Sequence, residues 1–160
     1  MSTTLRTPTA DDTAAMLALN NEFAVETSLL DMASLQQLVA WSFHVRIAGR
    51  MNGFCIALDQ EAPYQNVNFD WFRRKYPRFV YIDRVIVAAH ARGQGIARDM
   101  YGDLKRAVAN AGQDVLCCEI NIEPPNPASD RFHEAFGFVE VGRAFLARRG
   151  KTVRYLGLSI

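Results

Sequence analysis

The chain has 160 residues, of which 49% are hydrophobic and 22% charged, and its formal net charge is +1. This composition is typical of one globular domain and excludes a disordered tail, a fibrous repeat and a dedicated, strongly basic nucleic-acid binder. Three cysteines without a Cys-x-x-Cys spacing do not form a disulfide framework, which favours a reducing cytoplasm. The first residues lack the apolar core of a signal peptide, and no stretch approaches the roughly 18 apolar residues of a membrane helix, so we expect no membrane partner.

The N-terminal half of the chain changes from helical to strand patterns. The expected elements are a strand at 5–8, a helix at 9–21 capped by Thr9, a second helix that opens at Asp31, and strands at 42–48 and 54–58 that form a hairpin. The next segment, 59–77, mixes aromatic and basic residues without a clear period. We interpret it as a long lid or binding loop that can include a short helix.

The C-terminal half supplies two helices and four strands. The first helix, at 95–111, presents one apolar face and stops at Gly112. The second begins at Asn126 and stops at Gly137, with a buried face made by Ala128, Phe132 and Phe136. The strands are expected at 78–89, 115–120, 138–147 and 151–158. The pattern predicts a mixed α/β fold, with about six or seven strands and about four helices.

A glycine-rich segment, Arg92-Gly93-Gln94-Gly95-Ile96-Ala97, lies between a buried strand and an amphipathic helix. Its glycines let the backbone approach a ligand closely, and free amide N–H groups at the helix N-terminus attract an anion. With Arg92 and Arg98 adding positive charge, the expected occupant is a phosphate or pyrophosphate. A Walker loop needs Lys and Ser or Thr after its last glycine, and a dinucleotide fingerprint needs a small residue where Arg98 stands, so neither motif fits.

A third pyrophosphate pattern, Arg/Gln-x-x-Gly-x-Gly/Ala, fits residues 92–97 at every defined position. Further along the chain, Asn126 opens a segment that ends in the aromatic-rich turn Phe136-Gly137-Phe138. With the order of the elements, these motifs resemble the GNAT (N-acetyltransferase) superfamily over nearly the whole chain. The resemblance implies a single acetyl-CoA-binding domain over 1–160 whose sheet splays between the strands at 80–88 and 115–120.

The resemblance also implies how acetyl-CoA is held, and no metal is expected. The backbone of Val85 and Val87 would hold the pantetheine and the thioester carbonyl, with the Val87 amide as the oxyanion donor. The amides of 93–98 would hold the pyrophosphate. Asn126 would bind the pantetheine arm, although it is equally explained as a plain helix cap. The implied cofactor-binding residues are Val85, Ile86, Val87, Arg92, Gly93, Gln94, Gly95, Ile96, Ala97, Arg98 and Asn126.

Acetyl transfer to an amine poses two proton problems. An alkyl amine, with a pKa of about 10, must lose a proton before it attacks, and the leaving thiolate should gain one. Where the family usually has Tyr, this chain has His133, which is either a replacement acid or a packing histidine. Asp83 and Glu119 are the candidate bases, and either could instead pair with Arg84 or another cation.

The acceptor pocket implied by the resemblance lies between the first two helices and the hairpins. Glu22 and Glu26 there would suit a cationic amine, although a solvated helix end explains such acids as well. We expect transfer of acetyl from acetyl-CoA to a primary amine of a small molecule, peptide or protein. The alternatives are a non-catalytic acyl-CoA-binding module, a longer acyl donor or a hydroxyl acceptor. Nucleic acid is not an expected partner, and pairing of two copies through the final two strands is left open.

Overall fold

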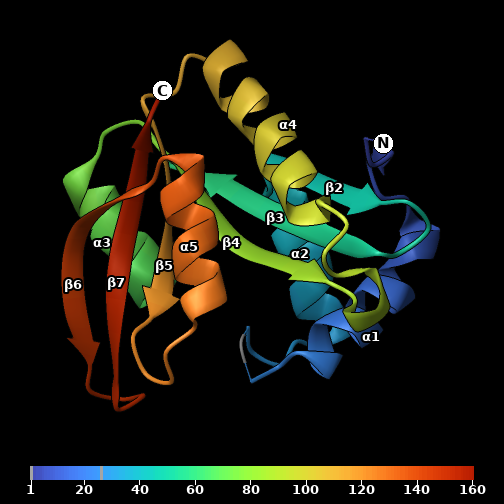
Figure 1. Ribbon diagram of the computed structural model, residues 1–160, viewed down its shortest axis with the longest axis horizontal. Coiled ribbons are helices and arrows are strands. Elements are labelled where there is room, and N and C mark those ends of the chain that lie inside the picture. The colour runs from blue at the N-terminus through green and yellow to red at the C-terminus, as the bar shows by residue number, and fades with distance from the viewer. Residues whose placement is uncertain (1, 26) are drawn as a thin grey trace.

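A seven-stranded mixed sheet forms the centre of the computed structural model, which describes residues 2–25 and 27–160 (Figure 1). The strands lie in the order β1-β2-β3-β4-β5-β7-β6, and β4 and β5 are parallel while the other neighbours are antiparallel. The expected mixed α/β class is confirmed. The strands are β1 (Leu5–Arg6), β2 (His44–Ala48), β3 (Gly53–Asp59), β4 (Val80–Val87), β5 (Val115–Asn121), β6 (Val139–Leu146) and β7 (Lys151–Ser159).

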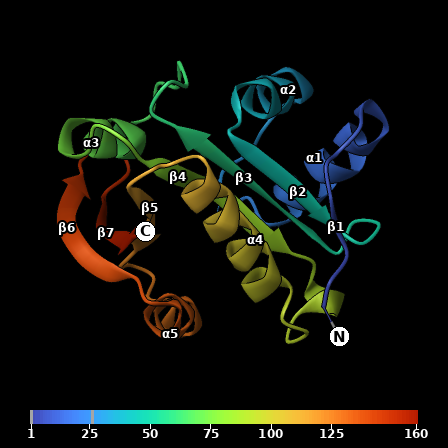
Figure 2. The ribbon, with the colours of Figure 1, turned by 90° about the horizontal axis from the view of Figure 1, so that it is seen from above.

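Helices cover both faces of the sheet. Seen from above, α4 and α5 lie on one face and α1, α2 and α3 on the other (Figure 2). Among the described residues, none of these helices is long and apolar enough to cross a membrane. The helices are α1 (Thr13–Glu22), α2 (Met32–Trp41), α3 (Val67–Lys75), α4 (Ile96–Asn110) and α5 (Pro127–Phe136), with short 3-10 turns η1 (Ala10–Asp12) and η2 (Ala89–Ala91) before α1 and α4.

The helix α3, at Val67–Lys75, is the short helix that the segment 59–77 was expected to be able to include, and it occupies about half of that segment. Asn66 caps it by accepting hydrogen bonds from the backbone N–H groups of Asn68 and Phe69. Phe69 and Phe72 are fully buried, and burying an aromatic side chain of this size contributes about 2 kcal/mol. The segment therefore packs on the sheet as part of the core, and its interpretation as a lid is wrong.

Two details of the predicted helices need correction. Thr9 is an N-cap, as expected, and its N–H donates to the Asp12 carboxylate, but the turn it caps is η1, and α1 itself begins only at Thr13. In α5, which ends at Gly137 as expected, Ala128 is exposed and His133 is the buried residue. The imidazole can occupy the buried position because both of its ring nitrogens find hydrogen-bond partners there.

The strands β4 and β5 part after two paired residues. Val80 pairs with Leu116 and Tyr81 with Cys117, and no later residue of β4 pairs with β5. Beyond this point β4 remains bonded to β3, and β5 remains bonded to β7. Each strand thus follows its other neighbour, β4 with β3 and β5 with β7, and the two diverge toward the ends of their arrows (Figure 1). The expected splay of the sheet between these strands is confirmed.

Candidate active site

A cleft of about 610 Å³ opens where β4 and β5 diverge. One wall comes from β4, the opposite wall from β5 and the loop that follows it, and the α1–α2 loop contributes to the lining. The start of α5 and the beginning of β7 contribute further side chains. The sequence-predicted residues that the structure brings together here are Asp83, Val85, Glu119, Asn126 and His133.

Glu119 lies beside the point where the strands part and receives two side-chain hydrogen bonds. The Tyr81 hydroxyl donates to its Oε2 at 2.7 Å, and the Asn68 amide donates to its Oε1 at 3.1 Å. Asn68 in turn accepts a hydrogen bond of 2.8 Å from the Tyr155 hydroxyl. Burial raises the pKa of Glu119 to about 7, against the opposing effect of the Tyr81 hydrogen bond, and the charge of Asp83 adds to the rise. A carboxylate with a pKa near neutrality is suited to general base catalysis.

Asp83 is neutralised by the residue that follows it. Arg84 Nε donates to Asp83 Oδ2 at 2.7 Å, and both side chains are almost completely buried. The same guanidinium donates to Asn20 Oδ1 at 2.6 Å, and the Asn20 amide donates to the backbone carbonyl of Ser28. These contacts fasten the α1–α2 loop onto β4. Because Asp83 is held in an ion pair, Glu119 is the better placed of the two predicted bases.

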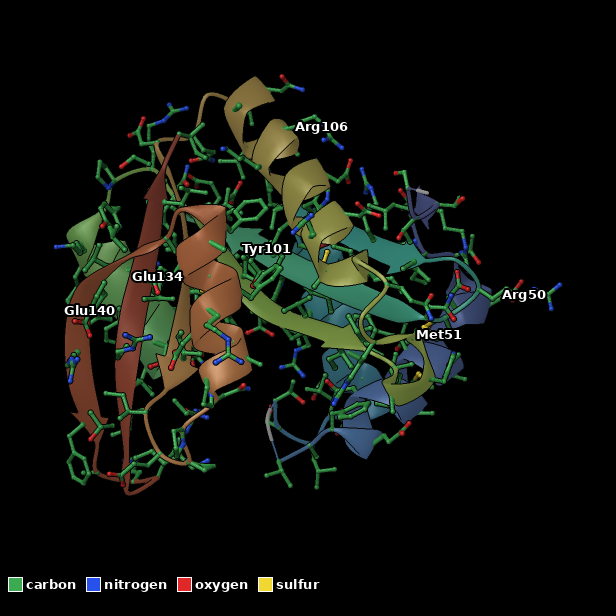
Figure 3. All side chains as sticks on the ribbon, viewed as in Figure 1. Arg50, Met51, Tyr101, Arg106, Glu134 and Glu140 are labelled. Carbon is green, nitrogen blue, oxygen red and sulfur yellow. The ribbon has the colours of Figure 1, made fainter. Side chains whose placement is uncertain are left out.

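His133 lies on the α5 side of the cleft with both ring nitrogens in hydrogen bonds. Nδ1 lies 2.8 Å from the Ser129 carbonyl, which only accepts, so Nδ1 carries the proton and the neutral ring accepts at Nε2 from the Tyr101 hydroxyl at 2.8 Å. Tyr101 reaches from α4 into the space between α4 and α5 (Figure 3). Burial lowers the pKa of His133 and raises that of Tyr101 well above its usual value, so the phenol is the protonated partner at neutral pH.

Tyr101 was missed as a site residue by the sequence analysis. It stands on the apolar face of α4 with Met100 and Leu104, where an aromatic residue is indistinguishable from ordinary core. Only the packing of α5 against α4 brings its hydroxyl to His133 and to the lining of the cleft. The signal available beforehand was the unusual histidine itself, which needs a hydrogen-bond partner when it is buried.

The glycine loop lies beyond the end of β4 and does not line the cleft itself. Gly93 and Gly95 have φ angles of 77° and 80°, and a Cβ added to either would meet nothing within 4 Å. Gly95 is the N-cap of α4, so the first amides of that helix have no intrahelical partner and can bind an anion. Of the two predicted basic residues, Arg92 stacks over Phe23 at 4.8 Å, and Arg98 lines a separate hollow against α4.

The inner edge of β4 is open along the cleft. Past Tyr81 that edge has no strand partner within the described part of the chain. Successive residues of β4 direct their backbone groups to opposite edges, and because the Ala88 N–H bonds to Asn52 beside β3, Ile86 also points toward β3. Val85 and Val87 therefore point backbone N–H and C=O groups to the open edge, where an extended ligand that carries amides can bond to them. Asn126 lines the cleft and accepts a hydrogen bond from the Ser129 N–H, so it does cap α5.

The acidic residues predicted for an acceptor pocket do not line the cleft in the described part of the chain. Glu22, at the end of α1, is exposed and is not part of the cleft lining, while Glu26 lies outside the described residues. The cleft is lined instead by two cations from the β6–β7 connection, Arg149 and Lys151. Neither cation was predicted as a site residue, because a basic turn between two strands usually is solvated surface.

A split sheet with an anion-binding helix start beside the split is the architecture of an acyltransferase that uses coenzyme A. The sequence matches the model of the acetyltransferase (GNAT) family over residues 20–138. The chain therefore belongs to this family, and the resemblance drawn from the glycine loop is confirmed. A search of curated protein sequences gives no match to the chain.

Solved structures share this fold over almost the whole chain. One is the NatC complex bound to Gag peptide and CoA, at 18% identity and a TM-score of 0.77, with 100% of this chain and 99% of that chain covered. A ribosomal-protein-alanine N-acetyltransferase from Brucella melitensis is 24% identical, with a TM-score of 0.74 and coverage of 98% and 99%. The yncA protein of Salmonella typhimurium, solved with acetyl-CoA, is 19% identical, with a TM-score of 0.73 and coverage of 99% and 94%.

Proposed function

We propose that the protein transfers the acetyl group of acetyl-CoA to a primary amine of a small molecule, peptide or protein by direct attack in a ternary complex. The observation that carries the proposal is Glu119, whose pKa of about 7 suits a base, beside the point where β4 and β5 part. Membership of the acetyltransferase family supports acetyl transfer. The neighbours solved with CoA or acetyl-CoA support the same donor.

The donor is held by backbone groups. The amides of 93–98 bind the pyrophosphate, with positive charge from Arg92 and Arg98 nearby, because the N-terminus of α4 offers unpaired N–H groups. The open edge of β4 at Val85 and Val87 bonds to the amides of the pantetheine arm. Asn126 lines the same channel from the opposite side and contacts the arm while it caps α5.

Glu119 activates the acceptor. In its ionised form it takes a proton from the amine, directly or through one water, and the amine nitrogen then bonds to the thioester carbon. The negative charge that develops on the carbonyl oxygen is stabilised by the Val87 N–H. Asp83 acts as a positioning residue, because its ion pair keeps Arg84 and the α1–α2 loop in place and its charge helps to raise the pKa of Glu119.

Tyr101 and His133 together provide the acid. When the carbon–sulfur bond breaks, the Tyr101 hydroxyl turns from His133 Nε2 to the departing sulfur and donates its one proton to the thiolate, and water in the cleft then returns a proton to the phenolate. His133 accepts the hydrogen bond of that hydroxyl in the resting protein and thereby fixes its position at the cleft. In this proposal Tyr101 takes the acid role expected of His133 from sequence, and His133 acts as its positioning residue.

The donor site is tested by titration of acetyl-CoA and of free CoA in a calorimeter. We expect micromolar binding by the wild type and none by Gly95→Trp, because the indole would cover the first amides of α4 and a φ of 80° is strained for any residue with a Cβ. Gly150→Trp is the matched control, since Gly150 has a φ of 60° and equally open surroundings.

Two outcomes would redirect the proposal. Absence of acetyl-CoA binding by the wild type would contradict acetyl transfer and leave the glycine loop as a turn or as a site for another anion. Binding without release of thiol in a panel of amines would instead favour a non-catalytic acyl-CoA-binding module.

The acid is tested by Tyr101→Phe. We expect kcat to fall by at least about tenfold, because the leaving thiolate loses its proton donor, with the KM for acetyl-CoA nearly unchanged. Steady-state kinetics with thiol detection separates the two constants. Tyr76→Phe is the control, since Tyr76 does not line the cleft. Wild-type kcat in Tyr101→Phe would show that solvent or another group protonates the thiolate.

A further inference from the structure

The acceptor side of the cleft has an excess of positive charge. Its acids in the described residues are Asp83 and Glu119, and its strong bases are Arg84, Arg149 and Lys151. The charges of Asp83 and Arg84 cancel in their ion pair, and Glu119, with a pKa of about 7, is only partly ionised near neutrality. Arg149 and Lys151 form no ion pair with any residue of 2–25 or 27–160. Two cations without an ion-pair partner among the described residues therefore line the cleft.

One of these cations, Arg149, lies close enough to the hydrogen-bond chain of Glu119 to act on Tyr155. Tyr155, which donates to Asn68 in the hydrogen-bond chain that leads to Glu119, has a pKa raised to about 12 chiefly by burial. Arg149 opposes that rise, so its charge acts on the same chain. An anionic group bound at this guanidinium would consequently lie in the same cleft as the reacting amine.

The register of the sheet gives the distance between the two points. Tyr155 lies opposite Glu119 in the β5–β7 pairing, and Lys151 is the first residue of β7, four residues earlier. At about 3.3 Å per residue, this separates Lys151 from the level of Glu119 by roughly 13 Å along the strand. This is a separation of the backbone, part of which the Lys151 side chain covers, whereas the carboxylate of a free amino acid is joined to its amine through one carbon and extends only a short way along it. An extended peptide, at about 3.3–3.6 Å per residue, spans it within about four residues.

On the basis of the proposed acetyl transfer, we propose that the acceptor is the N-terminal amine of a peptide or protein that carries acidic side chains at its third and fourth positions, which Arg149 and Lys151 bind. The cations would attract the acidic segment from solution and hold it so that the amine reaches Glu119. They would also disfavour a protonated amine in the cleft, which assists the deprotonation that the attack requires.

The test compares matched tetrapeptides with amidated C-termini, so that the side chains carry the only variable charge. The probes are Ala-Ala-Asp-Asp, Ala-Ala-Asn-Asn and Ala-Ala-Lys-Lys amides together with free alanine, and kcat/KM is measured for each with acetyl-CoA by thiol release. We expect the acidic peptide to exceed the neutral one by about tenfold, chiefly through KM, because two exposed charge pairs have this combined effect. The preference should weaken as salt is added.

Charge reversal identifies the residues responsible. The double variant Arg149→Glu with Lys151→Glu is expected to prefer the basic peptide over the acidic one. Arg148→Glu, an exposed residue of the same turn that does not line the cleft, should retain the wild-type preference. Because these positions are at the surface, folding is expected to be unaffected.

The outcomes separate this inference from the function on which it depends. Equal kcat/KM for the acidic and neutral peptides, or a preference that survives the double reversal, would overturn the inference and leave acetyl transfer intact. Faster acetylation of free alanine than of every peptide would do the same. Absence of turnover with every acceptor would overturn the proposed function and the inference together.

Discussion

Glu119→Gln is expected to lower kcat/KM at pH 7.5 by on the order of 100- to 10,000-fold, the usual contribution of a positioned general base. Glutamine keeps the shape of the side chain and can still bond to Tyr81 and Asn68, so the loss would reflect the missing base and not a collapsed cleft. The measurement is steady-state thiol release, accompanied by circular dichroism to verify folding. Glu140→Gln provides the control, since Glu140 lies on β6 in an exposed ion pair with Arg143.

The pH profile distinguishes catalysis from structural support. Only ionised Glu119 accepts a proton, and its pKa is about 7. The wild-type kcat/KM should therefore fall tenfold per pH unit below about pH 7 and become independent of Glu119 above it. Glu119→Gln should lack this limb and keep only the limb set by the acceptor amine. An unchanged limb near pH 7 in the variant would assign the base to another group.

Arg84→Met is expected to lower the free energy of unfolding by about 3–5 kcal/mol. Removing one partner of a buried ion pair leaves the other charge without compensation, and the carboxylate of Asp83 is only 3% exposed. The variant also removes the hydrogen bond to Asn20 through which the α1–α2 loop is held on β4. Urea unfolding at neutral pH measures the loss.

The double variant Asp83→Asn with Arg84→Met is the informative comparison. It removes the uncompensated charge, so it should recover much of the stability that Arg84→Met loses. A loss below about 1 kcal/mol in Arg84→Met would show that Asp83 becomes solvated or protonated without cost, and that the ion pair does not anchor the loop.

Local patterns predicted most of the architecture. The positions of the strands followed from alternation and apolar runs, and those of α4 and α5 from an amphipathic face, an asparagine cap and a terminal glycine. The helix within 59–77 was allowed for but not located, because its aromatic residues are interspersed with charges and show no clear period over the whole segment. Yet Asn66 with Phe69 and Phe72 three residues apart is a cap followed by a buried face. A shorter window would have detected it.

The polar contacts of the site lay beyond sequence reasoning because they join distant segments. The glycine pattern located the loop at 92–97, and the chemistry of the side chains suggested Glu119 and His133. The side chains of these two residues line the same cleft. The partner of His133 is a tyrosine 32 residues away, and the link from Arg84 to Asn20 spans 64. No period or motif couples such positions. They become neighbours only when α4, α5 and the α1–α2 loop pack on the sheet.

The split between β4 and β5 limits the backbone pairing between β1–β4 and β5–β7 to two residues on each strand. The shared core and the packed helices complete the connection, together with the hydrogen bonds from Tyr81 to Glu119 and from Tyr101 to His133. The groups proposed to move protons therefore also help to hold the two parts of the sheet together. A ligand that bonds to both sides of the split adds a connection where the two strands have no pairing of their own.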